Sequence, residues 1–192
     1  MGKTIALFGT SADPPTIGHK KILEELSKIY AFTISYVSNN PKKNHKEDIS
    51  IRSHLLKTLI EDLDNPKILF NQGVSSQWAV ESINKCKRIY EFNNLDFVIG
   101  SDLIKDIFQW KNFDRITHEV SFLIILREGY PVESNTLKML ETYRVKFKIS
   151  TIKTPNISSS KFRLNFNCSN LPSSLKDIVR KNNLYESIKL VE

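Results

Sequence analysis

Short apolar segments alternate with amphipathic segments along almost the whole chain. The segments predicted as strands are residues 3–8, 32–37, 68–70, 96–99, 120–126 and 145–149. The segments predicted as helices are residues 20–30, 51–63, 77–90, 103–108, 137–143, 159–165 and 172–182. This alternation predicts an α/β fold: a Rossmann-like, mostly parallel sheet with helices on both faces. The most apolar run, residues 120–126, is predicted to be a central strand.

The composition marks no boundary between domains. The 192 residues contain no internal repeat, low-complexity tract or Pro/Gly/Ser-rich linker, so we predict a single domain over residues 1–192, with a C-terminal helical portion from about residue 157. In folds of this class, ligands bind beyond the carboxyl ends of the strands, where helix N-termini present free amides. The turns that follow Phe8, Val37 and Ile99 are therefore expected to converge on a binding site.

Charge and cysteine content give weaker indications. The net charge of +7 suits an anionic partner such as a nucleic acid or a phosphorylated small molecule, but it is equally consistent with a lysine-rich solvated surface. The chain has no apolar run of the roughly 18 residues that a membrane-spanning helix needs, so no membrane partner is expected. Cys86 and Cys168 lack metal-ligand spacing and are too few for a disulfide framework, which favours a cytoplasmic location.

The segment after the first predicted strand, residues 9–19, reads GTSADPPTIGH and has the features of a phosphate-binding turn. Gly9 allows close approach of a ligand, and Gly18 leaves room at the start of the next helix. Thr16 and His19 are expected about one helical turn apart, where a hydroxyl, an imidazole and free amides suit a phosphate. Taken alone, the segment is also consistent with an ordinary turn in which Thr16 caps a helix and His19 lies on the surface.

A second segment, residues 156–163, reads NISSSKFR. Ser158 is expected to cap a helix whose first turn carries Ser159 and Ser160, with Arg163 one turn further on the same side. Hydroxyls, free amides and a guanidinium again suit a phosphate. The alternative for this segment alone is a capped helix with a surface arginine.

Together the two segments resemble the nucleotidyltransferases that carry an (H/T)-x-G-H motif near the N-terminus and an I-S-S-T-x-x-R-like motif near the C-terminus. Residues 16–19 (TIGH) match the first, and residues 157–163 (ISSSKFR) match the second with Ser in place of Thr. The chain is most similar to the bacterial-type nicotinate-nucleotide adenylyltransferases, over about residues 3–165. Asp13-Pro14, Gly18 and His19 agree with their opening motif, G-G-T-F-D-P-x-H-x-G-H.

Other positions extend the resemblance. Pro41 and Lys42 take the places of a loop Pro and Lys, and Arg52 that of an Arg at the start of the next helix. Gly100 and Asp102 match a G-x-D motif, which a Trp-containing segment with Trp110 follows. The chain departs from the pattern at Thr10, Ser11, Ala12 and Thr16, and at residues 77–83, where Trp78 replaces Tyr and Ala79 replaces Thr. The second departure lies where the family receives the pyridine carboxylate, so it leaves the choice between nicotinate and nicotinamide acceptors open.

The resemblance implies a role for each matched residue. The implied catalytic residues are His19, Thr16, Lys42 and Arg163. The implied ATP-binding residues are Gly9, Thr10, Ser11, Gly18, His19, Gly100, Asp102, Ile157, Ser158, Ser159 and Arg163. The implied acceptor-binding residues are Lys42, Arg52, Trp78 and Trp110. His19 is expected to act as an imidazolium, and Arg127 is expected to be structural. Mg²⁺ is the expected cofactor, held mainly by the ATP phosphates, with no protein residue predicted as a metal ligand.

The implied activity is adenylyl transfer from ATP to nicotinate mononucleotide, which gives nicotinate adenine dinucleotide and pyrophosphate in NAD biosynthesis. Nicotinamide mononucleotide and phosphopantetheine remain alternative acceptors. A non-catalytic nucleic-acid-binding protein is the alternative of a different class, but the chain has no recognition-helix pattern, RNA-binding aromatic motif or zinc spacing. We therefore expect small-molecule partners and no nucleic acid, and a homo-oligomer remains open.

Overall fold

The structure, a computed structural model, describes residues 2–40 and 43–185. Six strands form one sheet in the order β3-β2-β1-β4-β5-β6, and every neighbouring pair is parallel. The strands are β1 (Thr4–Thr10), β2 (Thr33–Val37), β3 (Ile68–Phe70), β4 (Asn94–Gly100), β5 (Ser121–Ile125) and β6 (Phe147–Ile149). The predicted α/β fold with a parallel sheet is confirmed.

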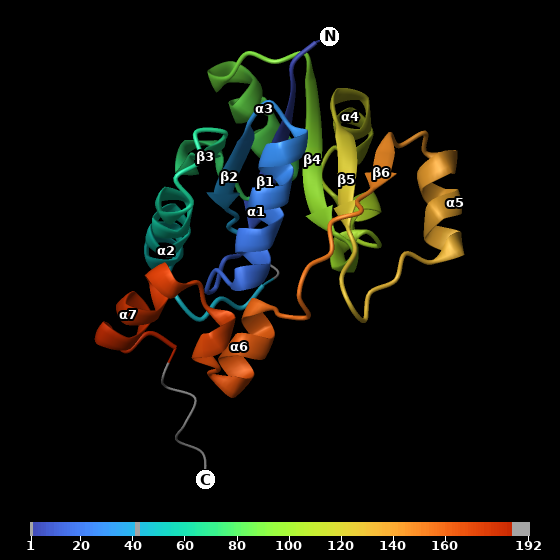
Figure 1. Ribbon diagram of the computed structural model, residues 1–192. Helices are drawn as coiled ribbons and strands as arrows, with labels where there is room; N and C mark the ends of the chain where they lie inside the picture. The colour runs from blue at the N-terminus through green and yellow to red at the C-terminus, as the bar shows by residue number, and fades with distance from the viewer. Residues whose placement is uncertain (1, 41–42, 186–192) are drawn as a thin grey trace.

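Helices cover both faces of this sheet (Figure 1). They are α1 (Ile17–Ile29), α2 (Ile49–Asp62), α3 (Ala79–Ile89), α4 (Phe113–Glu119), α5 (Ser134–Thr142), α6 (Ser159–Asn165) and α7 (Ser173–Lys181). Helices α1, α2, α6 and α7 share one core with Ala6 and Phe8 of β1, whereas α3, α4 and α5 share another with Ile5 and Leu7. One strand serves both cores because successive side chains of a strand point to opposite faces.

The turn region after β4 differs from the sequence-based prediction. Instead of a helix over residues 103–108, two 3-10 turns occur, Ser101–Leu103 and Ile107–Gln109, and α4 follows them without having been predicted. Asn112, in the left-handed backbone region, directly precedes α4 and separates it from the turns. The apolar side chains of these turns, Ile104 and Ile107, still enter the core, which explains their helix-like spacing.

Residues 120–126 contain the predicted strand, β5, but it is not one of the two central strands of the sheet. Strands β1 and β4 lie at the centre of the sheet, and β5 lies between β4 and the edge strand β6. Strand β5 is apolar because helices cover both of its faces, since Leu123 joins one core and Phe122 the other. The chain leaves β1 toward β2 on one side, and the later strand β4 pairs with β1 on its other side. This reversal creates a crevice at the carboxyl ends of β1 and β4, where ligands bind in such folds.

Candidate active site

A pocket of about 540 Å³ lies at this crevice. Its wall includes residues from the turns after Phe8, Val37 and Ile99, the three turns that were expected to converge. The volume falls within the range of about 300–1,000 Å³ that is typical of small-molecule sites. Both His19 and Arg163 line the pocket, so the two motif segments meet in space although they lie far apart in the chain.

Most of the residues predicted for the site belong to the pocket wall. They are Gly9, Thr10, Ser11, His19, Trp78, Gly100, Asp102, Trp110, Ser158, Ser159 and Arg163. Four predicted residues, Thr16, Gly18, Arg52 and Ile157, are not part of this wall. Lys42 lies outside the described residues.

His19 is held through both of its ring nitrogens. Its Nδ1 accepts a hydrogen bond from the backbone N–H of Thr16 at 3.0 Å, and the Thr16 hydroxyl lies 2.9 Å from the same nitrogen. Its Nε2 lies 2.9 Å from the hydroxyl of Thr10. Thr16 is the N-cap of α1 and His19 is the third residue of the helix, so the two form a capping box that begins α1 at Ile17, before the predicted start. Thr16 thus orients the His19 imidazole through Nδ1 and is not itself part of the pocket wall.

The contact with Thr16 determines the protonation state of His19. Because Nδ1 accepts an N–H, it carries no proton, and the ring proton resides on Nε2. Burial, together with the positive charges of Arg127 and Lys43, lowers the pKa of His19 to about 3. The contacts of His19 therefore fit a neutral imidazole with its proton on Nε2, whereas the expected imidazolium concerns His19 next to a phosphate and stays a prediction.

The two glycines of the opening turn lie close to neighbouring protein groups. A Cβ at Gly9 would lie 2.6 Å from the ring and hydroxyl of Tyr36, which also lines the pocket. Gly9 is therefore required by the packing of Tyr36, a requirement that the sequence did not reveal. A Cβ at Gly18 would lie 3.4 Å from the carbonyl oxygen of Ile157. These two residues thus bring the start of α1 close to the segment that leads into α6.

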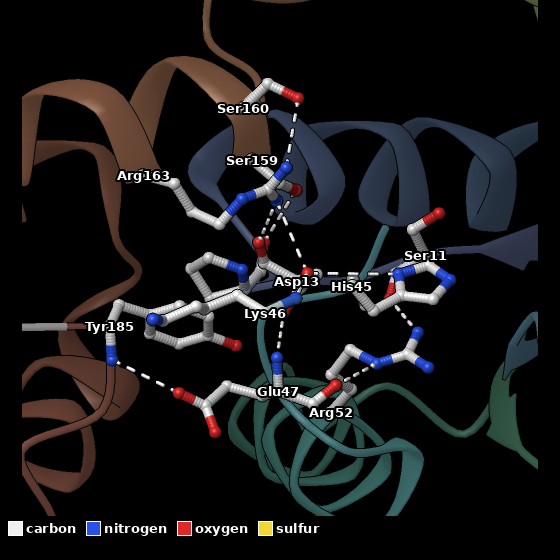
Figure 2. Close-up of polar contacts among 12 residues, drawn as sticks. Ser11, Asp13, His45, Lys46, Glu47, Arg52, Ser159, Ser160, Arg163 and Tyr185 are labelled. Carbon is white, nitrogen blue, oxygen red and sulfur yellow. Dashed lines mark hydrogen bonds and ion pairs between the residues drawn. The ribbon is translucent and has the colours of Figure 1, made fainter. Parts of the chain in front are cut away.

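Helix α6 carries the serine-rich segment to the opening turn. Ser158 caps the helix, as predicted, because its side chain accepts a backbone N–H of the first turn at 3.1 Å. Ser159 Oγ donates to the carbonyl oxygen of Pro14 at 2.9 Å. Figure 2 shows Arg163 reaching from α6 to the same turn, where its Nη1 donates to the carbonyl oxygen of Asp13 at 2.6 Å. Hydroxyls and a guanidinium of α6 therefore face the pocket beside the first motif.

An ion pair stands in the wall of the pocket after β4. Arg127 Nη1 lies 3.0 Å from Asp102 Oδ2, and the Arg127 backbone N–H donates to Ser101 Oγ at 2.9 Å. The other oxygen, Asp102 Oδ1, is buried and has no hydrogen-bond partner within the described ranges, which is an uncommon situation for a buried acceptor. A Cβ at Gly100 would lie 2.2 Å from this oxygen and 3.0 Å from Arg127 Nε. Glycine at this position is therefore a condition for the ion pair.

Another part of the wall is aromatic. Trp110 packs edge-on against Phe97, with ring centroids 6.0 Å apart. Trp78 is the residue before α3, and the ammonium group of Lys111 lies 5.1 Å from the centroid of its ring. Lys111 also pairs with Glu81 at 3.3 Å. Flat apolar surface next to charged groups suits a planar, polar ring.

Arg52 has a different place from the one expected for an acceptor-binding residue. Its side chain is buried, its Nε donates to the carbonyl oxygen of Glu47 at 2.9 Å, and its Nη1 donates to that of Ser11 at 2.8 Å. These bonds join the turn after β1 to the loop before α2, as Figure 2 shows. The predicted acceptor-binding role of Arg52 is therefore corrected: its side chain lies outside the pocket wall and holds together two segments that form the wall.

Several pocket residues were not predicted, and Asp13, Lys43 and His45 are the most informative of them. Asp13 is 1% exposed, and its Oδ2 lies 3.8 Å from His45 Nδ1. Asp13 belongs to the motif that carries the resemblance, so the signal to include it was present. Lys43 and His45 lie in a polar loop, where no periodicity indicates which side chains face inward.

Two properties bear on the class of site. Within residues 2–40 and 43–185, no group of three or more His, Cys, Asp and Glu side chains gathers to hold a metal ion. The same part of the chain contains no helix that is long and apolar enough to cross a membrane.

Comparison with known proteins places these features in context. The model of the cytidylyltransferase-like family matches residues 7–165. A probable nicotinate-nucleotide adenylyltransferase from Nitratiruptor is 30% identical over 145 residues, which cover 72% of this chain and 81% of the relative. One from Synechocystis is 28% identical over 196 residues, covering 94% of this chain and 98% of that protein.

Solved structures with the same fold include nicotinic acid mononucleotide adenylyltransferase of Plasmodium falciparum complexed with NaAD. Its TM-score is 0.78 at 23% identity, with coverage of 96% of this chain and 98% of that chain. A second structure of that protein, complexed with APC, has a TM-score of 0.75 at the same identity and coverage.

Proposed function

Because the chain belongs to the cytidylyltransferase-like family and, within it, to the nicotinate-nucleotide adenylyltransferases, we propose that it transfers the adenylyl group of ATP to nicotinate mononucleotide. The products would be nicotinate adenine dinucleotide and pyrophosphate. The observation that carries this proposal is the meeting of His19 and Arg163 in one pocket at the carboxyl ends of β1 and β4. Two helix N-termini, those of α1 and α6, begin next to this pocket and favour anionic ligands.

The chemistry requires little from the protein beyond position and charge. The phosphate of the mononucleotide, with a second pKa of about 6, is largely a dianion at neutral pH. One of its oxygens attacks the α-phosphorus of ATP as the bond from that phosphorus to the bridging oxygen breaks, and the electron pair leaves with pyrophosphate. No general base is needed, because the attacking oxygen carries no proton. Catalysis then rests on alignment of two anions and on stabilisation of the charge that moves to the leaving group.

We assign the triphosphate to the motif residues. Neutral His19 would exchange the contact of its Nε2–H with the Thr10 hydroxyl for a phosphate oxygen at the reacting end, with Thr16 keeping the proton on Nε2. Ser158 through its hydroxyl, Ser159 through its backbone N–H and Arg163 would hold the β- and γ-phosphates, since the Ser159 hydroxyl already donates to Pro14. Arg163 has guanidinium donors besides the Nη1 that binds Asp13. Hydrogen-bond donation by a neutral imidazole stabilises developing negative charge without a proton being released or taken up.

We assign the nucleosides to the two remaining parts of the wall. Asp102 Oδ1, buried without a partner in the described part of the chain, fits an acceptor for a ribose hydroxyl. The ring of Trp110 would support the pyridine ring, and Trp78 with Lys111 would lie near its carboxylate. Lys42 is retained as a proposed phosphate ligand on the strength of the resemblance alone, and Lys43 of the same loop lines the pocket.

Mg²⁺ is proposed to bind together with ATP. The ion prefers oxygen ligands and keeps several waters, so phosphate oxygens can supply most of its coordination. The described donor set fits such an arrangement, since the pocket wall offers the separate carboxylates Asp13, Asp102 and Asp106 but no cluster of three ligands within the described ranges. When bound, the ion would neutralise charge on the leaving pyrophosphate.

Pyrophosphate release is the test of this function. Purified protein is mixed with ATP and Mg²⁺, and with nicotinate mononucleotide, nicotinamide mononucleotide or phosphopantetheine in parallel. We expect release with nicotinate mononucleotide to exceed release with the other two. Turnover with only nicotinamide mononucleotide or only phosphopantetheine would change the acceptor, and turnover with none of the three would refute the activity.

A further inference from the structure

Asp13 lies between two structural parts of the pocket. It belongs to the turn after β1, its side chain is buried, and it lines the pocket. Helix α6, which carries Arg163, lies on one side of it. The loop of residues 43–48, which leads into α2 and contributes Lys43 and His45 to the pocket wall, lies on another side. Figure 2 shows Asp13 at the centre of the contacts among these segments.

Both carboxylate oxygens of Asp13 bind the backbone of the loop. Oδ2 accepts the N–H of Lys46 at 2.7 Å, and Oδ1 accepts that of Glu47 at 3.2 Å. Hydrogen bonds from backbone N–H groups to a carboxylate are stronger than those to neutral acceptors. Asp13 therefore determines the backbone path of the loop next to His45, whose Nδ1 lies 3.8 Å from Oδ2.

The same residue also fixes the guanidinium of Arg163. Arg163 Nη1 donates to the Asp13 carbonyl oxygen at 2.6 Å and lies 3.4 Å from Oδ2. Since the guanidinium is planar and rigid, fixing one nitrogen orients its other donors. A second hydrogen bond, from Ser159 to Pro14, keeps α6 against the same turn.

A buried tyrosine, Tyr185, contacts both the loop of residues 43–48 and helix α6. The backbone N–H of Tyr185 donates to Glu47 Oε1 at 3.2 Å, and its ring packs edge-on against Phe162 of α6 with centroids 5.8 Å apart. Burial, and then the charge of Asp13, raise the pKa of Tyr185. The loop and α6 are thus joined by a second route through Tyr185, a residue outside the range matched by the family model.

We propose that Asp13 is a positioning residue that couples the ATP side of the pocket, at Arg163, to the acceptor side, to which the resemblance assigns Lys42, the residue before the loop of residues 43–48 in the sequence. It holds Arg163 and the loop of residues 43–48 in one fixed relation, so that order on either side favours order on the other. The inference rests on the proposed function only for the identity of the two ligands. Asp13 itself needs no contact with a reacting atom.

The test compares Asp13→Asn with Asp48→Asn, a matched loss of one carboxylate at an exposed position of the same loop. We expect Asp13→Asn to raise the KM of ATP and the KM of nicotinate mononucleotide about tenfold each, a typical size for coupling between sites, and to change kcat much less. Asp48→Asn should leave both constants unchanged. Wild-type values of both constants in a folded Asp13→Asn protein would overturn the proposal.

A double-variant cycle tests whether Asp13 acts on ATP binding through Arg163 or through a general disturbance of the fold. In an Arg163→Ala background, Asp13→Asn should no longer change the KM of ATP, whereas its effect on the acceptor should persist. An equal effect on the KM of ATP in both backgrounds would show that Asp13 does not act through Arg163.

Hydrogen exchange of the wild-type protein gives a test that needs no variant. The amides of Lys46 and Glu47 should exchange slowly although they lie in a loop, and a non-hydrolysable ATP analogue should slow them further. Rapid exchange, or exchange that does not respond to the analogue, would contradict the coupling. Should the protein turn over no nicotinate mononucleotide, the proposed function would fail, but this response to nucleotide would still decide the role of Asp13.

Discussion

Substitution of His19 tests two roles that one side chain performs. The imidazole accepts the Thr16 N–H through Nδ1 and presents a donor through Nε2. His19→Ala removes both, whereas His19→Gln keeps an oxygen acceptor at the third helical position, where Glu and Gln occur in capping boxes. The pair of variants therefore separates helix capping from catalysis.

The structure gives the expected magnitudes. Loss of one preorganised donor to a developing charge lowers kcat by about 10²–10³-fold, so His19→Ala, which keeps no donor, should lose at least about a hundredfold. His19→Ala also leaves the buried Thr16 N–H unpaired, at a cost of about 1–3 kcal/mol. In a domain of this size each kcal/mol lowers Tm by about 2–4 °C, so His19→Ala should melt several degrees lower, and His19→Gln should melt close to the wild type.

The assays are pyrophosphate release at saturating ATP and acceptor, and thermal unfolding monitored by circular dichroism. Near-wild-type kcat in His19→Ala would remove the imidazole from the mechanism. Equal loss of Tm in both variants would refute the capping role of the ring.

Four further outcomes are expected. Gly100→Ala should raise the KM of ATP at least about tenfold, because its Cβ would displace Asp102 Oδ1 and Arg127; an unchanged KM would exclude this ion pair from ATP binding. Arg52→Met should cost about 1–3 kcal/mol in urea unfolding, since it leaves two partly buried carbonyl oxygens without their donor; a neutral effect would contradict its supporting role. Because folding lowers the pKa of His19 to about 3, the unfolded chain binds this proton first as the pH falls below about 6.5. Stability should therefore fall between pH 6.5 and 5, and less steeply in His19→Gln; identical slopes would show that His19 does not titrate in this way. Excess EDTA should stop pyrophosphate release and added Mg²⁺ should restore it, whereas full turnover in EDTA would refute the need for the ion.

Most helices and strands could be predicted from the sequence, because buried apolar side chains recur with the period of the element that buries them. Strand β1 alternates between two cores and α1 presents Ile22, Leu23 and Leu26 to one of them, so both were predictable. The 3-10 turns before α4 were not, since Ile104 and Ile107 enter the core at a spacing that a helix would share. The order of strands was also beyond reach, because an apolar run like β5 shows only that both faces are covered.

The site was predictable where a motif fixes both residue type and backbone. The opening turn and Ser158–Arg163 segment lie together as proposed, although no periodicity relates them. The protonation of His19 could not be foreseen, because it depends on which N–H reaches Nδ1. Arg52 was predicted to bind the acceptor, but its guanidinium binds backbone carbonyl oxygens outside the pocket wall. The sequence cannot distinguish the two roles, because the same donors serve either partner.

Isotope transfer tests the central claim most directly. Nicotinate mononucleotide labelled with ¹⁸O in its phosphate is incubated with ATP, Mg²⁺ and the protein, and both products are analysed by mass spectrometry. The account predicts that all of the label remains in nicotinate adenine dinucleotide and that pyrophosphate carries none, because the acceptor oxygen attacks the α-phosphorus. Label in pyrophosphate, or the absence of labelled dinucleotide, would contradict it.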